Sequence, residues 1–170
     1  IGAALVLELL LLLLYLNGRI DRLLDSDMSS EMILGQLLAR NNGILSDQWY
    51  YSTELRVLNT QLIYALFFRL SSNWHFVRMA STLVLWCVLI ASYGVLCRVM
   101  GCKKSFGVTA LLLAAPVSES YFRFVLAGVY YVPHLAIAFA ALALNEAYFK
   151  AKPDRKKFWL VVSVLLALVA

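Results

Sequence analysis

The residues that could do chemistry begin with three carboxylates early in the chain. Asp25, Asp27 and Glu31 lie within seven residues, shortly after the first hydrophobic run. A carboxylate can accept a proton from an attacking hydroxyl, or hold a divalent metal such as Mg²⁺ or Mn²⁺. Each also has a structural alternative: Asp27 can cap a helix, Asp25 can simply be solvated, and Glu31 can complete a capping box. The acidic segment is therefore a candidate catalytic site.

Further candidate residues follow along the chain. Arg56, Arg78 and Arg123 are candidate phosphate-binding residues, because the guanidinium fork matches phosphate oxygens, although each can instead anchor a helix at a membrane interface. Glu119 is either a metal ligand or the ion-pair partner of Arg123. His134 is either a helix-packing residue or a ligand contact.

The composition indicates that membrane helices position these residues. Of the 170 residues, 62% are hydrophobic and only 15% are charged, and the mean hydropathy is +0.78. A soluble domain has about 25% charged residues. The net charge of +5 comes from basic residues near the ends of hydrophobic runs, which is typical of topology signals. No basic patch is interleaved with exposed aromatic residues, so we predict no nucleic-acid partner.

Hydrophobic runs predict an all-α polytopic bundle in a single membrane domain. The run Met79–Cys97 has no charge and, as a helix, is about 28 Å long, enough to span a bilayer. The chain begins and ends within hydrophobic runs, so we expect a fragment of a longer membrane protein. The predicted spans are residues 1–17, 78–98, 105–124, 126–149 and 157–170.

The loop of residues 18–77 is predicted to contain two helices at the membrane surface, 28–41 and 56–70. The first has Asp27 or Ser26 as its N-cap and a stop signal at residues 41–43, Asn-Asn-Gly. The second is bounded by Arg56 and Arg69, and the residues between them span about 18 Å as a helix, which is too short to cross a core of about 30 Å. We therefore expect this helix to lie along the membrane.

The distribution of basic residues predicts how the chain is oriented in the membrane. Basic stretches follow Cys97 and Phe149, and by the positive-inside rule both are cytoplasmic. The loop of residues 18–77 and the turn containing Glu119 are then both exoplasmic. The acids of the first loop and Glu119 are therefore expected on one face of the membrane.

This arrangement resembles the glycosyltransferase-C superfamily of polytopic membrane enzymes. In that family the first exoplasmic loop carries a catalytic acid at the start of the first of two juxtamembrane helices, the position that Asp25-Ser26-Asp27 occupies here. In its metal-using members a further acid comes from a loop at the position of Glu119. The Asp-x-Asp pattern departs from the Asp-Glu dipeptide of some branches, which leaves open whether Asp25 or Asp27 is the matching acid.

The resemblance implies a GT-C-like N-terminal module that transfers a sugar, with inversion, from a polyprenyl-phosphate-type donor. It implies Asp27 and Asp25 as catalytic acids, and a glycan, lipid or protein as the exoplasmic acceptor. The expected location is a bacterial cytoplasmic membrane, with membrane lipids as partners. The alternatives are a transporter or lipid-linked-sugar flippase, with Glu8, Glu119 and His134 along its pathway, and a non-catalytic assembly subunit.

Overall fold

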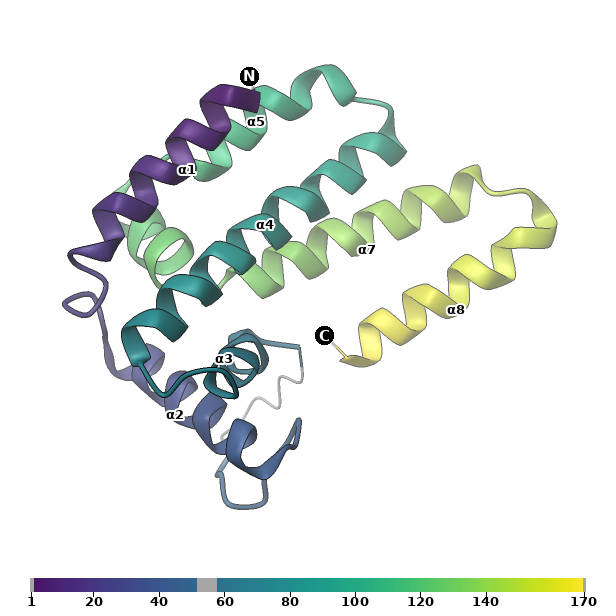
Figure 1. Ribbon diagram of the computed structural model, residues 1–170. Coiled ribbons are helices and arrows are strands. Elements are labelled where there is room, and N and C mark those ends of the chain that lie inside the picture. Colours follow the sequence, from purple (N-terminus) through teal and green to yellow (C-terminus); the bar gives the residue numbers. More distant parts are fainter. Residues whose placement is uncertain (1, 52–57, 170) are drawn as a thin grey trace.

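The computed structural model describes residues 2–51 and 58–169, and these form helices, turns and irregular segments with no strand (Figure 1). The all-α prediction is confirmed. The elements, in order, are α1 (Gly2–Asn17), α2 (Ser26–Asn41), α3 (Thr60–Phe68), α4 (Trp74–Met100), α5 (Lys103–Ala114), α6 (Glu119–Tyr121), the π-helix η1 (Phe122–Ala127), α7 (Val132–Lys150) and α8 (Pro153–Val169).

Two of the described helices, α4 and α7, are long and apolar enough to cross a membrane. They pack along each other, and α8 returns along α7 (Figure 1). Helix α4 begins four residues before the predicted span of residues 78–98, because Asn73 caps it by accepting a hydrogen bond from the Phe76 N–H at 3.1 Å. The shorter apolar helix α1 packs mainly against α5. These helices make the chain a membrane protein by length and composition.

The predicted span of residues 105–124 is broken in the structure, at the turn expected around Glu119. Helix α5 ends at Ala114, directly before Ala115-Pro116, and α6 with η1 continues at an angle of 88°. Proline lacks an N–H and disfavours helical backbone in the residue before it, so the chain turns here. The predicted span of residues 126–149 is also shorter at its start, because α7 begins only at Val132.

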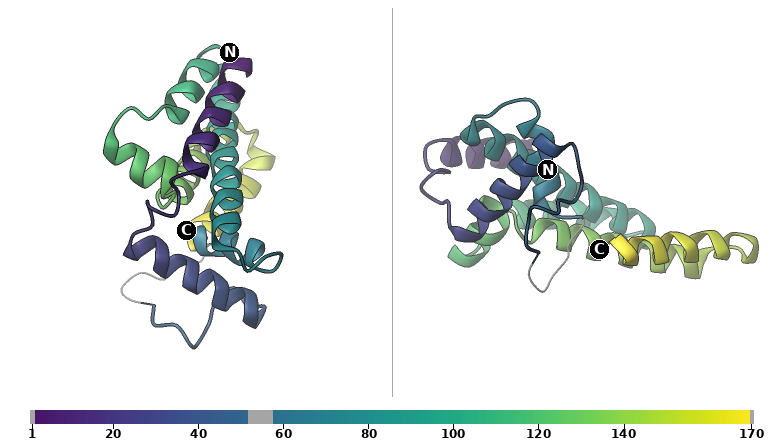
Figure 2. Two further views of the ribbon diagram at one scale, coloured as in Figure 1. Left: turned by 60° about the vertical axis from the view of Figure 1, so that its left-hand side comes forward. Right: turned by 90° about the horizontal axis from the view of Figure 1, so that it is seen from below.

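The two loop helices pack against each other and against the first turns of α4 (Figure 2). Helix α2 matches the predicted 28–41 except that it begins at Ser26, and it ends as predicted, with Asn42 in the left-handed region at φ 49°. Helix α3 lies within the predicted 56–70. The close contact requires Gly35, since a Cβ there would lie 2.7 Å from the Tyr64 Cβ.

A buried core joins α1, α4 and η1. Leu16, Leu89 and Leu126 are almost fully buried in it. The Trp86 indole N–H donates to the Leu126 carbonyl at 2.9 Å, which satisfies a carbonyl in the irregular η1 backbone. This core fixes the segment that leads from η1 into α7, and that segment reaches the acidic end of α2.

Candidate functional site

Asp25 is the N-cap of α2. Its Oδ1 accepts a hydrogen bond from the Met28 N–H at 2.9 Å, and its carbonyl accepts one from the Ser29 hydroxyl at 2.6 Å. The prediction that Asp27 or Ser26 caps the helix is wrong, because both residues already lie in the first turn. Asp27 is exposed there and makes no hydrogen bond or ion pair within the described part of the chain. The capping role and the exposed carboxylate thus belong to different residues.

Tyr130, which follows Asp25 by 105 residues in the sequence, contacts its side chain. Its hydroxyl donates to Asp25 Oδ1 at 2.5 Å, which joins α2 to the short segment between η1 and α7. Burial raises the pKa of Tyr130 well above its ordinary value, and so do the hydrogen bond to Asp25 and the negative charges of Asp27 and Glu31. The phenol therefore keeps its proton and stays a donor at neutral pH.

An unusual backbone conformation positions Tyr130. The π-helix η1 precedes it, and Val129 has φ 55°, which is rare for a β-branched residue. The Gly128 N–H donates to the Arg123 carbonyl at 2.8 Å, and a Cβ at Gly128 would lie 2.5 Å from that oxygen. π-Helices and strained residues held by their surroundings cluster at functional sites. Sequence reasoning missed Tyr130, and the only signal was the break that Gly128 and Pro133 make in a hydrophobic run.

Arg78 is buried beneath the acidic segment, with 2% of its surface exposed. Its guanidinium donates to the Ile20 carbonyl and lies 2.9 Å from the Met28 sulfur. Both terminal nitrogens of Arg78 contact protein atoms. Arg78 therefore holds the linker between α1 and α2, residues 18–25, against α4. Its predicted contact with a phosphate stays a prediction.

His75 fixes the same linker one turn earlier in α4. Its Nδ1 lies 2.9 Å from Asp21 Oδ2, and its Nε2 lies 3.2 Å from the Asn17 side-chain oxygen. Together with Arg78, it attaches the end of α1 and the linker to the first turns of α4. Sequence reasoning did not identify this role for His75.

Glu31 faces α3 and does not complete a capping box, because Met28 occupies the third helical position after the Asp25 cap. The Asn59 side-chain amide donates to Glu31 Oε1 at 3.3 Å. Nearby, burial raises the pKa of the Tyr64 phenol, and the negative charge of Glu31 raises it further. Glu31 therefore lies at the contact between the two loop helices, one turn from the exposed Asp27.

Of the other predicted residues in the described part of the chain, only His134 contacts this cluster, through Tyr130. Glu119 and Arg123 are both exposed, and among the described residues no ion pair joins them to each other or to the first-loop acids. His134 Nδ1 lies 3.2 Å from the Tyr130 carbonyl, so the ring nitrogen donates and supports the turn into α7. Arg56 lies outside the described residues. Within residues 2–51 and 58–169, no group of three or more His, Cys, Asp or Glu side chains is placed to hold a metal ion.

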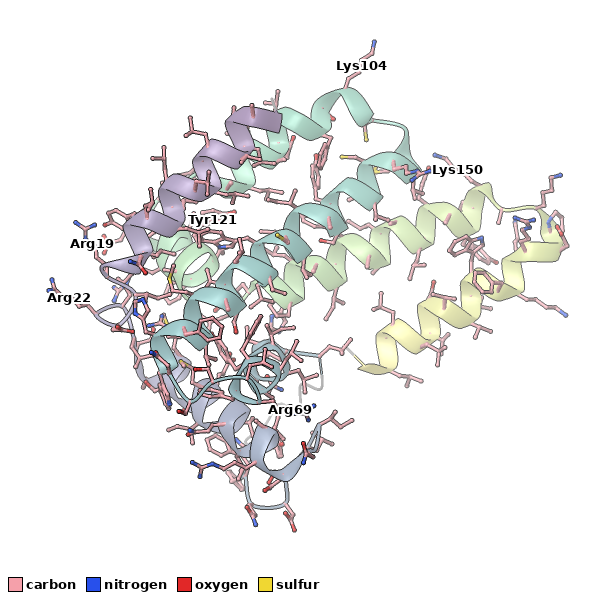
Figure 3. The ribbon with its side chains drawn as sticks, in the orientation of Figure 1. Arg19, Arg22, Arg69, Lys104, Tyr121 and Lys150 are labelled. Carbon is pink, nitrogen blue, oxygen red and sulfur yellow. The ribbon has the colours of Figure 1, made fainter. Side chains whose placement is uncertain are left out.

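A cavity of about 820 Å³ lies beside α1. Mostly apolar side chains of α1 and α5 line it, and Glu8 and Tyr15 are exceptions. The buried Glu8 Oε2 has no hydrogen-bond partner in the described part of the chain. At the far end, the Tyr15 ring meets Phe122 edge to face, and the Arg19 guanidinium lies 4.1 Å above it. Arg19 points outward from the linker in Figure 3.

Comparison of the chain with protein-family models, curated proteins and solved structures finds no match. The geometry of Asp25, Asp27, Tyr130 and Arg78 is therefore the basis for a functional assignment.

Proposed function

We propose that the chain is a membrane glycosyltransferase of the glycosyltransferase-C type. It moves a sugar from a polyprenyl-phosphate-type donor to an exoplasmic glycan, lipid or protein acceptor, with inversion. The observation that carries the proposal is the hydrogen bond from Tyr130 to Asp25. It joins the N-terminus of the first loop helix to the irregular turn before α7, with Asp27 exposed beside the contact.

The two aspartates have different roles in this proposal. Asp27 is the base: it accepts the proton of the acceptor hydroxyl as that oxygen bonds to C1 of the sugar. The C1–oxygen bond to the donor breaks, and the electron pair leaves with the lipid phosphate. Asp25 is a positioning residue, held by Tyr130 and the Met28 N–H. The α2 N-terminus favours an anion beside it, and the exposed Arg123 is a candidate phosphate contact.

Asp27 and Glu119 are the carboxylates expected to hold Mg²⁺ or Mn²⁺, but the described residues do not gather a three-ligand group around them. The proposed proton transfer needs only the exposed Asp27 carboxylate.

The test compares Asp27→Asn with Asp47→Asn in a membrane transfer assay. Asp47 is an exposed acid of the same loop that lies outside the site. A general base contributes about 10²- to 10⁴-fold, so Asp27→Asn should lose at least about 100-fold in transfer rate. Asp47→Asn should match wild type, and both proteins should reach wild-type levels in the membrane. Full transfer by Asp27→Asn would remove it from the mechanism.

A second candidate function is that of a lipid-linked-sugar flippase, which the cavity beside α1 favours. An unpartnered carboxyl oxygen within a membrane helix often marks a transport pathway. In sealed vesicles, a flippase moves a labelled polyprenyl-linked sugar across the bilayer without breaking its C1–oxygen bond, and Glu8→Gln slows that movement. Cleavage of the donor without translocation would favour the transferase.

A further inference from the structure

The turn between α7 and α8 holds a basic pocket that the proposed function does not use. Its volume is about 410 Å³. Three cationic side chains, Lys150, Lys152 and Arg155, line it together with one carboxylate, Asp154, and the Trp159 ring. A pocket with this excess of positive charge is suited to an anion.

Two of the three cations are available to a ligand. The Lys150 amine is already engaged, since it donates to the Val99 carbonyl at 2.7 Å and pairs with Glu146 at 2.9 Å. In Figure 3, Lys150 lies beside the end of α4. Lys152 and Arg155 are exposed and form no ion pair within the described residues. The Arg155 N–H donates to the Lys152 carbonyl at 2.9 Å, which places Lys152 directly before α8 and Arg155 in its first turn.

A separate, apolar cavity lies between α7 and α8. Its volume is about 430 Å³, and its walls are mostly aliphatic and aromatic. On α7 the lining residues recur on one face from Ile137 to Phe149, about 18 Å of helix. Phe149 directly precedes Lys150, and Leu160 of this cavity directly follows Trp159 of the basic pocket. The two cavities therefore have lining residues that are neighbours in sequence on both helices, although they share none.

We propose that these two cavities together bind one anionic phospholipid. The phosphate lies at Lys152 and Arg155, and one acyl chain extends between α7 and α8. A soluble anion would use only the basic pocket, whereas the neighbouring apolar cavity fits a hydrocarbon chain. Trp159 lies at the boundary, where tryptophan is enriched in membrane proteins. The α8 N-terminus adds a favourable dipole to the contacts made by the two cations.

The test uses the purified full chain in nanodiscs containing equal amounts of phosphatidylglycerol and phosphatidylcholine with identical acyl chains. Native mass spectrometry counts the lipid that stays bound. Wild type should retain one phosphatidylglycerol in preference to phosphatidylcholine. Lys152→Gln/Arg155→Gln should weaken that retention by at least about tenfold, since each basic residue near a membrane surface contributes about 1 kcal/mol.

The matched control is Lys156→Gln/Lys157→Gln. It removes the same charge from the same turn, but at side chains that do not line the pocket, and one of them, Lys156, lies over the Tyr148 ring. The control should retain the lipid as wild type does. An equal loss of bound lipid in both double variants would mean that diffuse surface charge retains the lipid, and it would overturn the proposed site.

Two further measurements test the lipid itself. Ala141→Trp fills the apolar cavity and should lower retention, whereas Ala138→Trp, on an exposed position outside it, should not. Millimolar inorganic phosphate should leave the bound lipid in place. Displacement by phosphate, equal retention of phosphatidylcholine, or no effect of Ala141→Trp would each contradict the proposal.

Discussion

The contact between Tyr130 and Asp25 predicts a measurable coupling between two residues far apart in the chain. Tyr130→Phe removes the hydroxyl that donates to Asp25 Oδ1 at 2.5 Å and leaves the ring in place. A hydrogen bond to a charged group contributes about 1.5–3 kcal/mol. Asp25 is half-exposed and keeps its bond from the Met28 N–H. We therefore expect a loss of about 1–2 kcal/mol in the free energy of unfolding.

A double-mutant cycle isolates the pair. Asn caps helices about as well as Asp, so Asp25→Asn keeps the Oδ1 that accepts from Met28 and Tyr130 but removes its charge. The cycle therefore measures the charge-dependent part of the contact. The free energy of unfolding is measured by circular dichroism in mixed micelles for the wild type, both single variants and the double variant. We expect a coupling of about 1 kcal/mol. Tyr131→Phe is the control, because that exposed hydroxyl makes no hydrogen bond within the described residues. A coupling below about 0.3 kcal/mol is indistinguishable from additivity and would refute the contact.

Three further predictions concern the surroundings of the site. Gly35→Ala should destabilise the chain by about 1–3 kcal/mol in the same unfolding assay, because the new Cβ meets Tyr64, whereas Gly18→Ala, with open space around it, should be neutral. Burial raises the Tyr64 pKa, so Tyr64 ionises at a lower pH in the unfolded chain than in the folded chain. The contribution of Tyr64 to the free energy of unfolding is therefore complete below about pH 10 and falls above it by up to about 1.4 kcal/mol per pH unit. Tyr64→Phe should flatten that fall when unfolding is measured as a function of pH. Arg78→Lys should lower the melting temperature and speed hydrogen exchange in the linker. A single ammonium cannot replace a guanidinium that contacts both Ile20 and Met28. Unchanged hydrogen exchange would contradict the role of Arg78.

The sequence was sufficient to predict features that depend on local chemistry. The uncharged run of α4 is long enough to span a membrane, as expected, and α2 ends within the predicted stop at residues 41–43. The N-cap was predicted at Ser26 or Asp27, one or two residues too late. Asp25, Ser26 and Asp27 all have side chains that can cap, and the choice of Asp25 coincides with its tertiary contact to Tyr130.

The features that the sequence did not reveal depend on tertiary contacts. A π-helix followed by a residue with positive φ has no local sequence signal, and here the Trp86 indole and the Gly128 backbone hold that geometry. The sequence also places Arg78 at a predicted interface, whereas the structure buries it under the linker. The turn expected around Glu119 falls where the structure bends, but hydrophobicity did not show that the bend is 88° or that α6 and η1 follow it.

The most direct test of the central claim is donor turnover by the purified full chain. The protein is incubated with a radiolabelled polyprenyl-phosphate sugar in detergent micelles, with and without candidate acceptors, and the released polyprenyl phosphate is measured. We predict sugar transfer, or slow hydrolysis of the donor when acceptor is absent, that depends on Asp27. No donor turnover above a protein-free control, or equal turnover by Asp27→Asn, would contradict a glycosyltransferase centred on the first-loop aspartates.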